Sequence, residues 1–176
     1  MLKIAITGPE STGKTTLARQ LATHYHALWV PEYARFYLPF LDRPYTPEDV
    51  VEMAKGQVNW ENELAKLTKT FLFCDTDLIV SKIWLKFKYH IENEWIETQL
   101  KSKPYTLHLL CNIDLPWQDD PLRENPNLQD RQTIYDLYKK ELETLDVPFF
   151  EIGGSEEKRL AQAIAILEKQ AILRTW

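Results

Sequence analysis

The sequence predicts an α/β fold in which a five-stranded parallel sheet is covered by helices on both faces. Five short apolar runs of strand length alternate with segments of helical periodicity, the pattern that strands joined by crossover helices produce. Each run is apolar throughout rather than at alternate positions, as expected for strands that are buried on both sides. The predicted strands are residues 2–7, 28–30, 71–74, 106–111 and 149–152.

Three of the predicted helices have recognisable starts. Residues 14–21 follow the first strand and a short loop, and carry apolar residues at helical spacing. Thr46 is followed by a proline and two acids, which supply a capping hydroxyl, a suitable first residue and charges that offset the helix dipole. Ser155 precedes two glutamates in the same way and begins the last helix.

One long segment fits neither a strand nor a helix. Residues 114–130 are rich in Pro, Asp and Asn and lack apolar periodicity. A loop of this length in a compact domain is often a lid over a functional site. We therefore expect a lid at about residues 114–130, within a single domain that comprises all 176 residues.

Composition excludes several classes of function. The net charge is −5 and the basic residues are scattered, which argues against nucleic acid as a partner. No run approaches the roughly 20 apolar residues of a membrane span, and the first strand begins too early for a signal peptide, so we expect a cytoplasmic protein. Cys74 and Cys111 lie in apolar runs and predict reduced core thiols. The oligomeric state is left open.

Residues 8–15 read GPESTGKT and match the phosphate-binding pattern G-x-x-x-x-G-K-[ST] in full. Gly8 and Gly13 allow the backbone to turn tightly and to direct its N–H groups at phosphate oxygens, beside the positive end of the next helix. Lys14 then reaches the β and γ phosphates, and the Thr15 hydroxyl binds Mg²⁺. The alternative is a glycine turn that matches by coincidence, but its place between a strand and a helix disfavours chance. The pattern predicts an ATP- and Mg²⁺-dependent phosphotransferase with a P-loop kinase fold.

The nucleotide is expected to contact the whole phosphate loop, an arginine beyond the lid, and backbone after the last strand that could receive adenine. These cofactor-binding residues are Gly8, Glu10, Ser11, Thr12, Gly13, Lys14, Thr15, Thr16, Arg131 and Gly153.

Acidic residues follow the second and third strands, at the sheet edge where ligands bind in parallel α/β folds. Phosphoryl transfer needs one carboxylate to hold Mg²⁺ and another to accept the proton of the attacking hydroxyl. Asp75 suits the metal together with Thr15, and either Glu32 or Asp77 could be the base. Asp77 could instead serve as the N-cap of a helix, and the two roles can coincide.

Several other polar or aromatic residues are candidates with an open alternative. Arg123 and Arg131 could stabilise the transferring phosphoryl group when the lid closes, or could be solvated surface arginines. Gln57 shares a helix face with apolar residues and needs a partner in the substrate or in the protein. Trp117 could stack on a flat ring or pack as a hinge of the lid. His108 lies within an apolar strand, where a core or surface role is expected.

The order of five motifs resembles that of nicotinamide riboside kinase domains of the NadR type, to about residue 160. The motifs are residues 8–15, Glu-Tyr-Ala-Arg at 32–35, Gly-Gln at 56–57, Phe-Cys-Asp-Thr-Asp at 73–77 and Trp-Gln-Asp-Asp-Pro-Leu-Arg at 117–123. The resemblance implies ATP-dependent phosphorylation of the riboside 5′-hydroxyl to give nicotinamide mononucleotide, a step of NAD salvage.

The positions of polar and aromatic residues in the phosphate loop, after the second and third strands, in the lid and on an otherwise apolar helix face predict their roles. Catalysis is expected from Lys14, Glu32, Asp75 and Arg123, and substrate binding from Glu32, Tyr33, Arg35, Gln57, Asp77 and Trp117. Family members are often fused to an adenylyltransferase with an H-x-G-H signature, which residues 24–27 do not match, so we expect kinase activity only.

Two other functions are compatible with the sequence. A kinase for another nucleoside or small hydroxyl compound would use the same chemistry in a different pocket. A nucleotide-dependent switch or ATP sensor would belong to another class, but residues 112–114 lack the N-K-x-D spacing of guanine-binding switches. A purely structural anion site is a third possibility.

Overall fold

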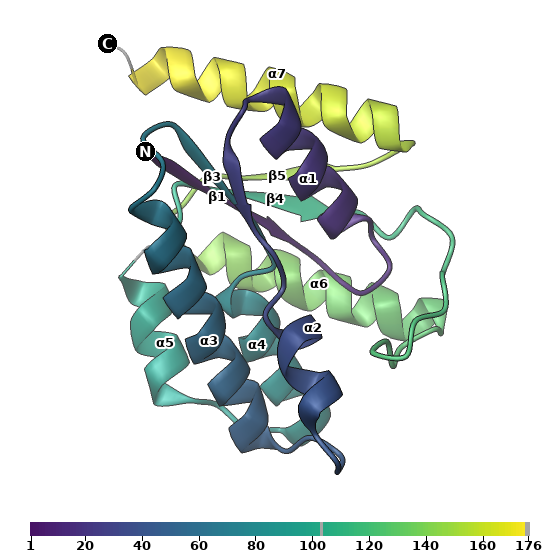
Figure 1. The fold of residues 1–176 in the computed structure, drawn as a ribbon. Helices are drawn as coiled ribbons and strands as arrows, with labels where there is room; N and C mark the ends of the chain where they lie inside the picture. The colour runs from purple at the N-terminus through teal and green to yellow at the C-terminus, as the bar shows by residue number, and fades with distance from the viewer. Residues whose placement is uncertain (103, 175–176) are drawn as a thin grey trace.

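A computed structural model that describes residues 1–102 and 104–174 confirms the predicted parallel sheet (Figure 1). The strand order is β2-β3-β1-β4-β5, so β1 lies at the centre and every neighbouring pair is parallel. Three strands coincide with their predictions, whereas β3 extends by one residue and β4 begins one residue later. The strands are β1 (Leu2–Thr7), β2 (Leu28–Val30), β3 (Phe71–Asp75), β4 (Leu107–Cys111) and β5 (Phe149–Ile152).

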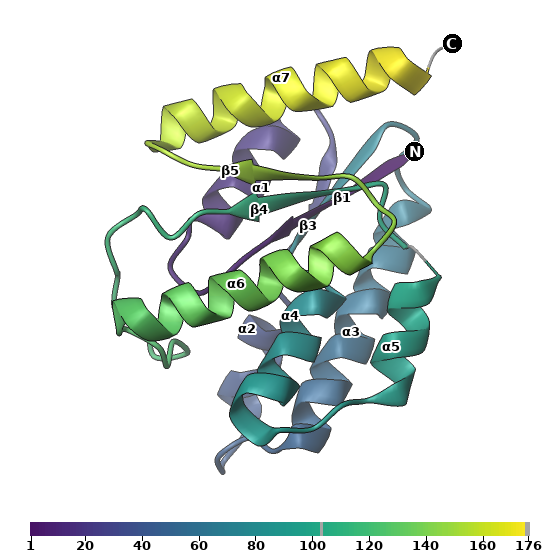
Figure 2. The same cartoon turned by 180° about the vertical axis from the view of Figure 1, so that it is seen from behind.

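Helices cover both faces of the sheet, as Figures 1 and 2 show from opposite sides. One face carries α1 (Lys14–His24) and α7 (Glu156–Arg174), and the other carries the remaining long helices. No helix in residues 1–102 and 104–174 is both long and apolar enough to span a membrane. The other helical segments are α2 (Ala34–Tyr37), a 3₁₀ turn (Leu38–Phe40), α3 (Pro47–Ala65), α4 (Leu78–Trp84), a π-helical turn (Leu85–Tyr89), α5 (Glu94–Lys101) and α6 (Leu128–Thr144).

The central strand β1 carries apolar residues at consecutive positions because helices cover both of its faces. Ile4 and Ile6 pack into a cluster with α1 and α7, whereas Ala5 between them packs into a cluster that Trp60 of α3 covers from the other side. Both faces of β1 are therefore buried, and each successive side chain contributes to a hydrophobic layer. Cys74 in β3 and Cys111 in β4 are buried free thiols, as predicted, and β1 lies between the two strands.

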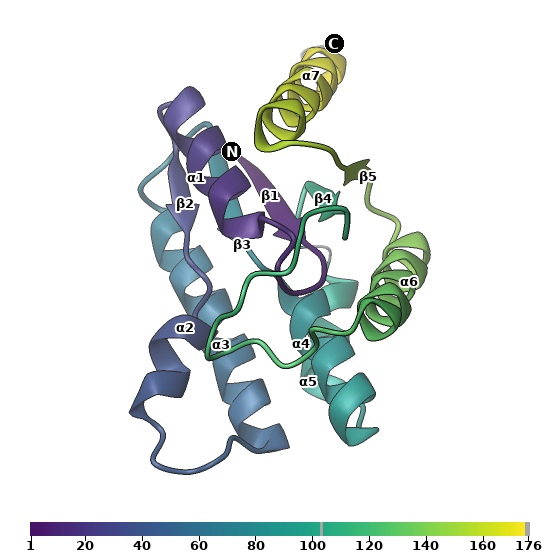
Figure 3. The same ribbon diagram turned by 90° about the vertical axis from the view of Figure 1, so that its right-hand side faces the viewer.

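The carboxyl ends of β1, β3 and β4 meet at one edge of the sheet. The chain leaves β1 for α1 on one face and leaves β3 for α4 on the other, which makes this edge a topological switch point. The loop between β4 and α6 passes in front of the same edge, as the end-on view in Figure 3 shows. Segments from three distant parts of the sequence thus converge where a ligand is expected.

The long loop ends three residues earlier than the predicted lid of residues 114–130. Residues 112–127 lie outside helices and strands, and α6 begins at Leu128. The side chain of Asn127 accepts a hydrogen bond from the Gln129 N–H at 2.7 Å and so caps α6. Three residues assigned to the loop from composition therefore form the first helical turn.

Candidate active site

The phosphate loop needs glycine at two positions because of its backbone shape. Gly8 has φ of +132°, and a Cβ there would lie 2.8 Å from the carbonyl oxygen of Cys111. Gly13 has φ of +77° and is the N-cap of α1, where its carbonyl accepts the Leu17 N–H at 3.0 Å. The loop can therefore lie tightly against β4 while the amino end of α1 faces the site.

The side chain of Lys14 folds back onto the phosphate loop. Its ammonium donates to the carbonyl oxygens of Gly8 at 2.9 Å and Pro9 at 2.8 Å. Thr12 donates its hydroxyl to the same Pro9 oxygen at 2.8 Å, which stiffens the turn. The positive charge therefore lies at the mouth of the loop, where it can neutralise phosphate oxygens.

Two adjoining cavities meet at Lys14. The polar cavity, of about 350 Å³, is lined mainly by residues 10–16, 32–38 and 115–123. The apolar cavity, of about 120 Å³, extends under α3, α4 and α6, where Val50, Met53, Ile134 and other apolar side chains line it. The walls that both cavities share are Glu10, Lys14, Glu32, Ala34, Leu38 and Leu122. A phosphate donor in one cavity and an acceptor in the other would meet beside Lys14.

Thr15 and Asp75 are adjacent, as a metal site would require. The Thr15 hydroxyl donates to Asp75 Oδ2 at 2.6 Å, while Oδ1 is buried without a hydrogen-bond partner among the described residues. Asp75 is only 1% exposed, and this burial, with the nearby charge of Glu32, raises its pKa to about 6. A bound cation would offset the cost of burying this carboxylate, so the residues fit Mg²⁺.

The protein offers Mg²⁺ few ligands of its own. The part of the chain that the structure describes contains no group of three or more His, Cys, Asp or Glu residues that could hold a metal. Mg²⁺ keeps several waters and commonly takes phosphate oxygens as ligands. The Thr15 and Asp75 pair therefore fits a cation that arrives with a nucleotide.

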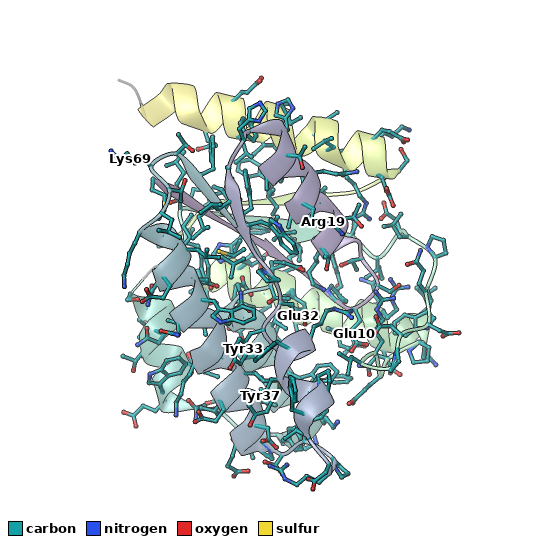
Figure 4. The ribbon with its side chains drawn as sticks, viewed as in Figure 1. Glu10, Arg19, Glu32, Tyr33, Tyr37 and Lys69 are labelled. Atoms are coloured by element: carbon teal, nitrogen blue, oxygen red, sulfur yellow. The ribbon has the colours of Figure 1, made fainter. Side chains whose placement is uncertain are left out.

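Glu32 lies where the two cavities join, and Figure 4 labels it together with Glu10 of the phosphate loop. Its carboxylate is 3.2 Å from Arg35 Nε. Arg35 also donates to Asp120 Oδ2 at 2.9 Å and so joins the segment after β2 to the 112–127 loop. The structure therefore places Glu32 and Arg35 together at the cavity walls, where the sequence predicted them.

Asp77 and Gln57 line the apolar cavity and also have partners within the protein. Asp77 Oδ1 accepts the Val80 N–H at 3.2 Å, which caps α4, and the Thr7 hydroxyl at 3.0 Å. Gln57 Oε1 accepts the Tyr33 N–H at 2.8 Å. The predicted capping role of Asp77 is present, and both side chains still face the cavity.

Arg123 and Arg131 both reach Ser11 of the phosphate loop. Arg123 lines the polar cavity and donates to the Gln118 carbonyl oxygen at 2.5 Å. Arg131 lies in the first turn of α6, is 4% exposed, and donates to the Ser11 carbonyl oxygen at 3.3 Å. Burial lowers the pKa of Arg131. Arg131 is therefore not the solvated surface arginine that the sequence left as an alternative.

Four predicted site residues do not line either cavity: Asp75, which accepts the Thr15 hydroxyl, and Tyr33, Trp117 and Gly153. The Tyr33 ring packs against Gly56 and lies edge-on to Trp60, with 4.7 Å between ring centroids. Trp117 lies 5.6 Å from the Arg131 guanidinium, so its ring contacts a cation of the protein itself. The N–H of Gly153 donates to Gln162 Oε1 at 3.2 Å, although Glu156 a few residues later does reach the polar cavity.

Arg159 is a buried residue of the site that the sequence analysis missed. Its guanidinium donates to the carbonyl oxygens of Thr12 at 2.8 Å and Asn112 at 3.0 Å, and it pairs with Asp114. It therefore fixes the phosphate loop to the segment after β4. The available signal was an arginine within the apolar stripe of the last helix, one turn before Ala163.

A polar network joins the 112–127 loop to the walls of the apolar cavity. The Tyr45 hydroxyl donates to Glu124 Oε1 at 2.7 Å and accepts from Trp84 Nε1 at 2.6 Å. Lys88 pairs with Glu124 at 2.7 Å and lies 4.0 Å from the centroid of the Tyr45 ring. The Glu124 N–H donates to Glu10 Oε2 at 3.0 Å. These residues come from separate segments, so no local pattern could have grouped them.

The sheet, the phosphate loop and the cavities that meet at Lys14 define a nucleotide-binding protein with a P-loop kinase fold. A family model described as an AAA domain matches residues 3–159, and the chain belongs to this family.

Curated relatives are the trifunctional NAD biosynthesis/regulator proteins NadR of two bacteria. The protein of Escherichia coli strain K12 is 25% identical over 173 residues, covering 94% of this chain and 42% of NadR. That of Salmonella typhimurium strain LT2 is 25% identical over 157 residues, covering 87% and 38%. The predicted resemblance to NadR is therefore confirmed as homology, and the chain spans less than half the length of these relatives.

Solved structures share the fold. A NadR protein in complex with NR matches with a TM-score of 0.72 and 24% identity, covering 96% of this chain and 51% of that one. Thymidylate kinase from Ehrlichia chaffeensis matches with a TM-score of 0.67 and 13% identity, covering 94% and 98%. These matches confirm the predicted P-loop kinase fold, and the NadR homology supports kinase activity.

Proposed function

We propose that this protein is an ATP-dependent kinase that phosphorylates the 5′-hydroxyl of nicotinamide riboside to give nicotinamide mononucleotide. The observation that carries the proposal is the junction of the two cavities at Lys14, with Glu32 on the shared wall. Homology to NadR supports the same substrate, because NadR is a protein of NAD biosynthesis and a NadR protein has been solved with NR.

In this proposal ATP occupies the polar cavity with its γ-phosphate between Lys14 and Arg123, whose positive charges stabilise the charge that spreads over the phosphoryl oxygens. Thr15 and Asp75 would hold Mg²⁺, which when bound would supply further positive charge to the phosphates. The riboside lies in the apolar cavity, and Glu32 accepts the proton of its 5′-hydroxyl. The hydroxyl oxygen then bonds to the γ-phosphorus, and ADP leaves.

The walls of the apolar cavity suit a cationic ring. Tyr45 and Trp84 supply aromatic surface, and Glu32 and Asp77 supply negative charge. A pyridinium cation is attracted to aromatic faces and to carboxylates, whereas a neutral nucleobase gains less from the same wall. Lys14 and Arg131 also line the cavity, but Lys14 lies at its junction with the polar cavity and Arg131 donates to the Ser11 carbonyl oxygen. Lys88 lies close to the Tyr45 ring, and Glu124 balances its charge.

A substrate screen tests the proposal. The purified protein with Mg-ATP is incubated with nicotinamide riboside, adenosine, cytidine or uridine, and ADP release and product mass are followed. We expect kcat/KM for nicotinamide riboside to exceed the others by at least about tenfold. Equal rates would indicate a kinase of broader specificity, and ATP hydrolysis that no nucleoside accelerates would favour a nucleotide-dependent switch.

Substitution of Trp84 sharpens the test. Trp84→Leu should lower kcat/KM for nicotinamide riboside by about tenfold, because one aromatic wall of the cavity is lost. Trp95→Leu is the matched control, since Trp95 packs in the same hydrophobic layer without lining the cavity. Equal losses in the two variants would mean that Trp84 acts only through packing.

A further inference from the structure

A buried histidine lies directly behind the apolar cavity. His108 is 1% exposed in β4, and its Nε2 lies 3.3 Å from Oδ2 of Asp77, which is 2% exposed at the start of α4. Asp77 Oδ2 and both imidazole nitrogens lack a partner in hydrogen-bond geometry among the described residues. Three unsatisfied buried polar atoms therefore lie together on one side of the proposed acceptor site.

A leucine at position 108 would suit the strand better on packing grounds alone. Residues 107 and 109–111 are all buried and apolar, and His108 pairs with Ala5 of the central strand. A buried polar group without a partner costs free energy, so its presence at a cavity wall points to a role. The Tyr105 ring lies edge-on to the imidazole, with 5.2 Å between ring centroids.

The opposite oxygen of the same carboxylate is already fixed. Thr7 and the backbone of Val80 both donate to Asp77 Oδ1, from β1 and from the first turn of α4. These two bonds hold one oxygen, whereas Oδ2 has no donor in hydrogen-bond geometry among the described residues. His108 Nε2 lies 3.3 Å from this second oxygen and is the donor in reach.

We infer that His108 is a positioning residue for Asp77: its Nε2–H donates to Oδ2 after a small rotation of the ring, and fixes the carboxylate in the cavity wall. A carboxylate fixed in this way can accept a hydrogen bond from a sugar hydroxyl of the nucleoside without loss of side-chain freedom on binding. This inference deepens the proposed function and rests on it, because it gives Asp77 a contact with the substrate.

A double-mutant cycle tests the inference. His108→Leu, Asp77→Asn and the double variant are compared by kcat/KM for nicotinamide riboside, or for whichever nucleoside the wild type phosphorylates fastest. We expect His108→Leu to lower kcat/KM about tenfold, mainly through KM of the nucleoside, with KM of ATP unchanged. In the Asp77→Asn background His108→Leu should cause no further loss. His108→Gln, which retains an N–H donor, should restore activity to within about threefold.

A purely structural histidine predicts different results. The loss from His108→Leu would then be the same factor in both backgrounds, would follow the fall in Tm, and would affect KM of ATP equally. Any of these outcomes would overturn the inference.

A second measurement does not require turnover. In ¹⁵N-labelled wild-type protein, Nε2 of His108 should carry a slowly exchanging proton whose resonance moves on Asp77→Asn. An unprotonated Nε2, or a resonance that does not respond, would refute the pair. If no nucleoside is phosphorylated, the proposed function is wrong, and this resonance alone decides whether His108 and Asp77 are paired.

Discussion

The two walls of the candidate site are built in different ways. The floor, formed by the phosphate loop and by residues 75–77, is fixed by buried contacts to strand ends, such as the bond between Thr7 and Asp77. The roof, formed by the 112–127 loop, is fixed largely by partly exposed charged pairs, such as those of Arg35 with Asp120 and Lys88 with Glu124. Exposed pairs contribute only about 0–1 kcal/mol each. Lys14, Thr15 and Asp75 therefore lie on a firmly anchored base, whereas Arg123 lies in a roof that weaker contacts anchor.

Removal of Lys14 should have the largest effect. Lys14→Ala is expected to lower kcat by several hundredfold, because the ammonium neutralises charge on the transferring phosphoryl group, while the fold remains intact. The measurement is ADP release at saturating Mg-ATP and nucleoside, with Tm as the check on folding. Lys55→Ala, which removes an exposed lysine paired with Glu52, should leave both unchanged. Near-normal turnover of folded Lys14→Ala would disprove the assignment of the phosphate loop.

Asp75→Asn should weaken Mg²⁺-dependent catalysis by about a hundredfold. An amide cannot supply the anionic charge that holds the cation, so the rate should recover partly at high Mg²⁺. Binding of ATP without Mg²⁺, measured by calorimetry, should change much less. If metal-free binding fell as far as catalysis, Asp75 would be structural.

The same carboxylate should make the metal-free protein less stable as pH rises. Asp75 has a folded-state pKa of about 6 against an ordinary value of 3.8, so between these pH values the folded chain holds a proton that the unfolded chain has lost. The free energy of unfolding in EDTA should therefore fall from about pH 4 to pH 6, by on the order of 2 kcal/mol, and then level off. Asp75→Asn should abolish this contribution, which urea denaturation at several pH values would measure. An unchanged pH profile would mean that Asp75 does not titrate there.

Substitutions in the roof should lower kcat less than substitutions in the floor. Arg123→Ala is expected to lower kcat about tenfold, because a charge that reaches the phosphoryl group only from a loop that weaker contacts anchor is replaced in part by water. Arg19→Ala, which removes an arginine on the outer side of α1, serves as the control. A loss as large as that of Lys14→Ala would mean that the roof is as rigid as the floor.

The smallest effect is expected at the outer end of the roof. Lys88→Met breaks the pair with Glu124 and should raise KM of the nucleoside about two- to threefold, with kcat unchanged. Lys139→Met breaks a similar pair with Glu151 far from the site and should have no effect. The difference should shrink in high salt, because screening weakens the Lys88 pair in the wild type.

The floor and the roof also differ in how much of each can be predicted from the sequence alone. The floor was predictable because its signals are local: the glycines and Lys14 within one loop, and Asp75 at the end of an apolar strand. The composition also predicted the position of the roof, but it did not predict the contacts of the roof or the aromatic wall, because Tyr45, Trp84 and Glu124 meet only through the tertiary fold. The sequence predicts Tyr33 as a substrate contact, whereas its ring packs against Gly56 and Trp60.

The contact between Tyr33 and Gly56 has a consequence for how this sequence can evolve. A Cβ at position 56 would lie 2.2 Å from Cε1 of Tyr33, so a side chain can appear there only if the ring moves or is lost. The adjacent Gln57 holds the Tyr33 backbone from the same helix. Substitutions at Tyr33, Gly56 and Gln57 should therefore be tolerated only in combination. The motifs at residues 32–35 and 56–57, although far apart in the chain, should vary together among homologous sequences.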